Sequence, residues 1–168
     1  MKERPKIKLQ LTLTDRIIEI TSYIALIAFW VMAITSFKTL PENIPTHFNG
    51  SGEVDSYGPK TTIFFFPVMA TVMFAFLAFI IKKPETFNYT VEITEENAQE
   101  QYTNATKLIR ILKLALIIIF LIIDYKTIET SKGNSNGLGK WFLPFTMVLI
   151  FIPILFAVYN SFKKKENR

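Results

Sequence analysis

One long apolar run decides the fold: IIEITSYIALIAFWVMAITSF, residues 17–37, in which Glu19 is the only charged residue. At about 1.5 Å of rise per helical residue, about 20 residues cross the roughly 30 Å hydrocarbon core of a bilayer. Three further windows of similar character are predicted to cross it, at about 61–81, 108–125 and 141–159. The 168 residues, half of them hydrophobic, are therefore predicted to form one all-α membrane domain, a four-transmembrane-helix bundle covering residues 1–168.

Lys and Arg are distributed unevenly over the flanks of these windows. Fourteen of the nineteen lie in the N-terminal segment, in the connection 82–107 with the start of the third window, and in the C-terminal tail. Because basic flanks stay in the cytoplasm, both termini and the connection 82–107 are predicted to be cytoplasmic, and residues 38–60 form an outer loop. The net charge of +5 is thus explained by multi-pass topology in the cell membrane and by anionic lipid, and no nucleic-acid partner is expected.

Two polar segments on the predicted cytoplasmic side alternate between apolar and polar residues. Residues 7–14 alternate from Ile7 onward, and residues 87–93 alternate from Phe87 onward. A period of two indicates half-buried strands, so the segments are predicted to pair into a small two-stranded cytoplasmic sheet. Strand pairing with a second chain, in a homo-oligomer, is the alternative.

A helix is predicted to begin at Thr94 and to continue into the third window. Thr94 is a suitable N-cap, and Glu95 and Glu96 complement the helix dipole in the first turn. Two acids, Glu19 and Asp124, lie inside apolar windows. Both are near window ends, so we expect their carboxylates to reach headgroup water.

The outer loop 38–60 is dense in residues with special backbone preferences. Pro41 and Pro45 stiffen the chain, Asn49-Gly50 is typical of a tight turn, and Gly52 permits a positive φ. The loop is therefore predicted to be an ordered hairpin or compact loop over the outer ends of the helices. The loop 131–140, rich in Gly, Asn and Ser, is predicted to be a flexible turn.

The outer loop also carries a recognisable pattern: Leu40-Pro41, Ile44-Pro45, His47-Phe48-Asn49, Gly52, Asp55, Gly58 and Lys60, between two apolar windows. This pattern resembles the bacterial membrane domain of unknown function family 1648. That domain also forms the front part of larger immunity proteins that protect bacilli against the sporulation-delaying protein toxin. The resemblance implies a bacterial plasma-membrane protein and no established catalytic activity.

The polar residues of the outer loop are its candidate site. His47, Asn49, Gly52, Asp55 and Lys60 are candidates either for ligand binding or for structuring the loop. In the structural alternative, His47 bonds a loop carbonyl, Asp55 accepts backbone donors, and Lys60 pairs with Asp55 or lies at the headgroups. A third hypothesis is a metal site on His47, Glu53 and Asp55.

The residues needed for catalysis are scarce. The chain has no cysteine and one histidine, and it lacks a nucleophile-elbow or zincin motif, so neither an enzyme nor a cofactor is expected. The favoured hypothesis is a binding or sensory, immunity-type membrane protein that recognises a peptide or envelope component through its outer loop. The alternatives are a structural or assembly subunit of a membrane complex, a small oligomeric channel, or a metal-binding membrane protein.

Overall fold

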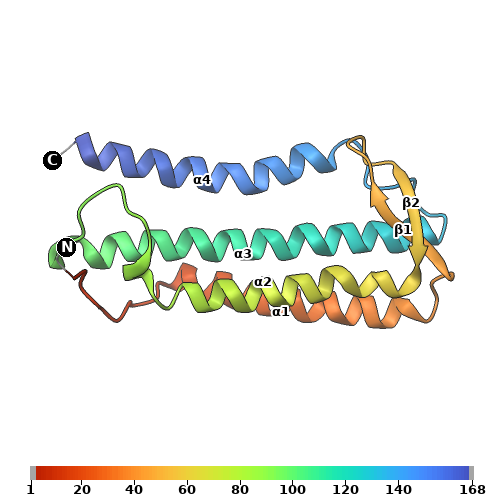
Figure 1. Cartoon of the computed structure of the whole chain (residues 1–168), viewed down its shortest axis with the longest axis horizontal. Helices are drawn as coiled ribbons and strands as arrows, with labels where there is room; N and C mark the ends of the chain where they lie inside the picture. Colours follow the sequence, from red (N-terminus) through yellow and green to blue (C-terminus); the bar gives the residue numbers. More distant parts are fainter. Residues whose placement is uncertain (1–2, 167–168) are drawn as a thin grey trace.

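Four long helices and one β-hairpin make up the molecule (Figure 1). The computed structural model describes the backbone of residues 3–166 and the side chains of residues 3–160. The hairpin lies at one end of the bundle, and both ends of the chain lie at the other (Figure 1). In chain order the elements are α1 (Leu13–Phe37), β1 (Asn43–Phe48), β2 (Val54–Pro59), η1 (Lys60–Phe64), α2 (Phe65–Ile80), η2 (Pro84–Thr86), α3 (Glu95–Ser131) and α4 (Phe142–Glu166).

Helix α3 is the centre of the bundle. It contacts α1, α2, α4 and β1, and its 37 residues give it a length of about 55 Å. The backbone N–H of Thr94 donates to Asn97 Oδ1 at 2.9 Å in a capping box, and Glu95 and Glu96 lie in the first turn. The predicted helix start and its continuation into the third window are confirmed.

Three segments of the described chain are long and apolar enough to cross a membrane: Leu13–Phe37, Lys60–Ile80 and Phe142–Asn160. They coincide with three of the four predicted windows. The window 108–125, within α3, is not among them, because it contains Arg110, Lys113 and Asp124. All three side chains are buried, so the bundle surrounds these three charged groups, while the other helices expose many large apolar side chains.

The predicted two-stranded cytoplasmic sheet is wrong. The described residues of 7–14 and 87–93 contain no strand, and α1 already begins at Leu13. The two-stranded sheet of the structure is instead the antiparallel β1–β2 pair inside the loop 38–60. The prediction that this loop is an ordered hairpin is confirmed.

The two alternating segments do meet, through side chains that pack at the start of α3. A buried cluster of Ile93, Ala98 and Tyr102 is covered by Ile7, Leu9, Tyr89 and Val91. Side chains bond backbone carbonyls in and beside these segments: Arg4 donates to the carbonyls of Glu85 and Phe87, and the Tyr102 hydroxyl donates to that of Pro5. Burial raises the pKa of both the Tyr89 and the Tyr102 phenols, so both rings stay neutral well above pH 7.

Candidate functional site

The tip of the hairpin is shaped by Asn49. The side-chain Oδ1 of Asn49 accepts from the backbone N–H of Ser51 at 2.9 Å and from that of Glu53 at 3.1 Å. The backbone N–H of Asn49 donates to the backbone carbonyl of Glu53 at 2.9 Å. A short amide side chain that bonds the backbone in this way fixes a turn. The side chain of Asn49 therefore holds the turn at the tip.

Gly52 joins the tip to the loop between α3 and α4. Its φ is +77°, and its carbonyl accepts from Leu138 N at 2.7 Å and from Gly139 N at 3.3 Å. A β-bridge between Glu53 and Gly137 extends the contact. The loop 131–140, predicted to be a flexible turn, is thus tied to the hairpin at its glycine-rich half, because glycines on both sides let two backbones approach closely.

The other three candidates, His47, Asp55 and Lys60, take part in two separate ion pairs. His47 Nδ1 lies 2.5 Å from Asp55 Oδ1, with the side chains 68% and 41% exposed. Lys60 Nζ lies 2.8 Å from Glu42 Oε1 and 5.3 Å from the centre of the Phe37 ring. The structure therefore joins His47 to Asp55, whereas Lys60 pairs with Glu42 and not with Asp55.

The three metal candidates are not brought together. Glu53 Oε2 bonds Asn49 Nδ2 at 3.2 Å and is not part of the His47–Asp55 pair. In the described residues no group of three or more His, Asp or Glu side chains is arranged to hold a metal ion.

A cavity of about 420 Å³ lies beneath the hairpin. Strand β1 contributes residues 44–48 to its wall, and α3 contributes Ile123, Asp124 and Thr127. The remaining wall residues between β2 and α3 are Thr62 and Ile63 of η1 and Phe65 and Phe66 of α2. The hairpin is held over it because Ile44, fully buried, packs with Leu40, Ile63 and Ile128. The hairpin thus closes a space between helices at the end of the bundle.

Asp124 is the unexpected member of this cavity wall. Its side chain is 2% exposed, and its Oδ2 has no hydrogen-bond partner among the described residues. The expectation that Asp124 reaches headgroup water is therefore wrong. Sequence reasoning missed the site because Asp124 ends an apolar run, but its spacing of three from Thr127 places both on one helix face, which is the available signal.

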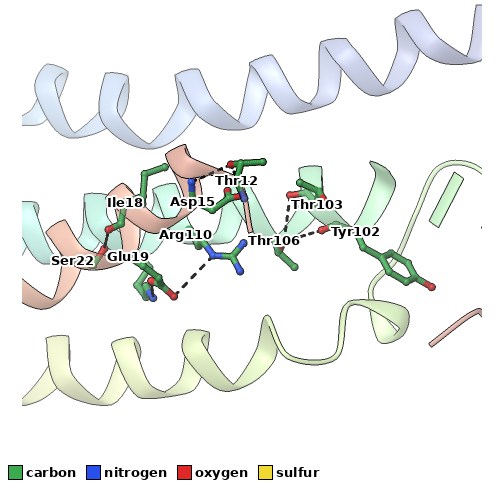
Figure 2. A network of polar contacts seen from close by, with 10 residues as sticks. Thr12, Asp15, Ile18, Glu19, Ser22, Tyr102, Thr103, Thr106 and Arg110 are labelled. Atoms are coloured by element: carbon green, nitrogen blue, oxygen red, sulfur yellow. Dashed lines mark hydrogen bonds and ion pairs between the residues drawn. The ribbon is translucent and has the colours of Figure 1, made fainter. Parts of the chain in front are cut away.

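A buried ionic cluster fastens α1 to α3 nearer the other end (Figure 2). Glu19 forms an ion pair with Lys113, whose Nζ also lies 4.3 Å from the centre of the Phe74 ring. Arg110 Nε lies 4.0 Å from Glu19 Oε1. Figure 2 shows Glu19 and Arg110 pointing toward one another between the two helices. Arg110 and Lys113 were counted with the basic flank of the third window, yet both side chains are buried. Their spacing of three places them on one helix face, which is the available signal.

A second, larger hollow of about 750 Å³ lies between α3, α4 and residues 88–90. Its α4 wall includes Pro153, Phe156 and Ala157, and the membrane-length segment of α4 has no buried residue. This hollow is the gap beside a helix that packs on one side only, whereas the cavity under the hairpin contains a buried carboxyl group. The hairpin end is therefore the better candidate site.

Comparison with known proteins supports the family resemblance. Residues 24–71 match the family described as Domain of unknown function (DUF1648), a range that contains most of α1, the hairpin, η1 and the start of α2. An uncharacterized protein of Archaeoglobus fulgidus is 24% identical over 156 residues, which cover 84% of this chain and 82% of that protein. No solved structure gives a significant match. The predicted resemblance to this family is confirmed.

Proposed function

We propose that this protein is a multi-pass protein of the cell membrane that binds a ligand at the hairpin end of its helix bundle. Three apolar, membrane-length helices support the membrane location, and the distribution of Lys and Arg supports an outer position for the hairpin. One observation carries the binding proposal: the hairpin covers a cavity whose wall holds the buried Asp124, and among the described residues its Oδ2 has no hydrogen-bond partner. A buried polar group is costly unless it is bonded, so such a site is suited to a ligand.

The hairpin is also a preformed surface for recognition. Its tip is fixed by Asn49 and by the contact of Gly52 with Gly139, while the His47–Asp55 pair remains exposed on it. A surface that is ordered before binding loses less conformational entropy when a partner arrives. We propose a peptide or an envelope component as the partner, in a sensory or immunity-type role.

A structural subunit of a membrane complex is the second candidate. The observation that favours it is α4, which packs on α3 and exposes large apolar side chains such as Phe151, Leu155 and Phe156. In that case the hairpin only holds the helices together, and the exposed His47 pairs with Asp55 without contacting any ligand.

The variant His47→Ala separates the two candidates. Protein reconstituted in lipid nanodiscs is titrated with peptide fractions from the growth medium of cells that produce it. Recognition by the hairpin predicts a peptide whose affinity falls at least about tenfold in His47→Ala, since desolvated recognition contacts each contribute about 1–2 kcal/mol. The unfolding midpoint should hardly move, because an exposed ion pair contributes about 0–1 kcal/mol. A lowered midpoint, together with no binding that depends on His47 or Asp55, would favour the structural subunit.

A further inference from the structure

We propose that the cavity beneath the hairpin binds an alkylammonium group, with Asp124 as the counter-charge and the aromatic wall around it enclosing the apolar part of the ligand. This inference rests on the proposed function, since it names the chemical class bound at the same end of the molecule. The ammonium group has two sources, a free small amine or the amino group of a peptide, and both present the same charge and the same N–H donors.

The first argument is the state of Asp124 itself. The side chain is 2% exposed, it lines the cavity, and its Oδ2 has no partner among the described residues. A carboxyl group buried without a counter-charge stays neutral, and it ionises when a cation is placed beside it. A cationic N–H donor supplies that charge and bonds the carboxylate oxygens, which only accept hydrogen bonds once they are ionised.

The second argument is that the protein supplies no such cation. Neither Lys nor Arg is among the described residues that line the cavity. The nearby Lys126 Nζ donates to Ser135 Oγ at 3.1 Å, and Lys60 is paired with Glu42. His47, which does line the cavity, is engaged by Asp55. Among the described residues no free cationic side chain faces Asp124, so a cation that pairs with it would come from a ligand.

The third argument is the rest of the wall. Phe48, Phe65, Phe66 and Phe142 line the cavity together with aliphatic residues. Aromatic faces attract cations and also accommodate apolar groups. A volume of about 420 Å³ falls within the range of ordinary small-molecule sites, which bury an apolar body around a few polar contacts. A carboxylate in such a wall selects an ammonium on an apolar body over a neutral or anionic analogue.

The test compares matched probes on the full protein in nanodiscs. The first pair is phenethylamine and the neutral 2-phenylethanol; the second is the dipeptide Phe-Phe-amide and its N-acetylated form. We expect each amine to bind at least tenfold more tightly than its neutral counterpart in calorimetric titrations, and Asp124→Asn to remove that preference. The control variant Glu129→Gln removes an acid from the same helix outside the cavity and should keep the preference. A preference confined to phenethylamine identifies a small amine as the source, whereas a preference in both pairs shows that a peptide amino group is also accepted.

A second measurement uses the unmodified protein, in case Asp124→Asn does not fold. Dicyclohexylcarbodiimide, an apolar reagent that adds to buried carboxyl groups, should label Asp124, and phenethylamine should protect it while 2-phenylethanol does not, as judged by mass spectrometry of the peptides. Equal binding of amine and alcohol, or absence of labelling or of protection, would overturn the inference. A ligand whose binding depends on His47 but not on Asp124 would leave the proposed function standing and overturn this inference alone.

Discussion

Single residues at the hairpin tip determine whether the site forms. Gly52 combines a φ of +77° with contact to another backbone: a Cβ added there would lie 2.6 Å from the N and O atoms of Gly139. The sequence shows a glycine suited to a turn, but it does not show that the partner is a loop almost ninety residues away. That pairing depends on how α3 and α4 place their connecting loop, and no local pattern encodes it.

The variant Gly52→Ala should therefore destabilise the hairpin end. A left-handed backbone at a residue with a side chain costs about 1–3 kcal/mol, and the overlap with Gly139 adds to this cost. We expect a loss of at least about 2 kcal/mol in the free energy of unfolding, measured by thermal unfolding in detergent. Gly50→Ala is the matched control, since a Cβ there meets nothing within 4 Å, and it should be close to neutral. Equal effects of the two variants would contradict this account of the tip.

Among the elements, α3 departs furthest from what its sequence pattern predicts. Its N-cap, its acidic first turn and its apolar window correctly predicted one long helix. The burial of Arg110 and Lys113 could not be predicted from α3 alone, because it depends on Glu19 of α1. The failed strands have a similar cause: alternation predicted correctly that one face is buried, but tertiary packing on Ala98 and Tyr102 replaced strand pairing.

The ionic cluster between α1 and α3 should contribute strongly to stability. Glu19→Gln removes the counter-charge of Lys113, whose side chain is 1% exposed, and that of Arg110. Because an uncompensated buried charge is costly, we expect a loss of about 3 kcal/mol in the free energy of unfolding in detergent. The double variant Glu19→Gln, Lys113→Met removes the Glu19–Lys113 pair and should recover part of that loss. If Glu19→Gln unfolds at the wild-type midpoint, the cluster is not a structural element.

On the scale of the whole molecule, the fold separates a hairpin end from an end that holds both termini (Figure 1). The basic residues in the loops and terminal segments are distributed unevenly between these two ends. Most of them lie at the end that holds the termini. The apolar windows and the charge distribution of the sequence therefore predicted the order of the helices and the position of the hairpin. They did not predict the cavity, because its wall is assembled from β1, η1, α2, α3 and α4, which are far apart in the sequence. Among the described residues Asp124 is the only charged one that the helices contribute to this wall.

This division predicts the orientation of the protein in a cell. The chain has no cysteine, so single cysteines can be introduced at exposed positions without removing any other. Ser51, at the hairpin tip, and Thr86, in the connection between α2 and α3, are both exposed. Because basic flanks stay in the cytoplasm, a membrane-impermeant maleimide applied to intact cells should label Ser51→Cys and leave Thr86→Cys unlabelled until the cells are lysed. The reverse pattern would place the hairpin in the cytoplasm and remove the basis for recognition of any extracellular ligand. If neither site is labelled before lysis, the prediction that the hairpin lies outside the cell membrane is contradicted.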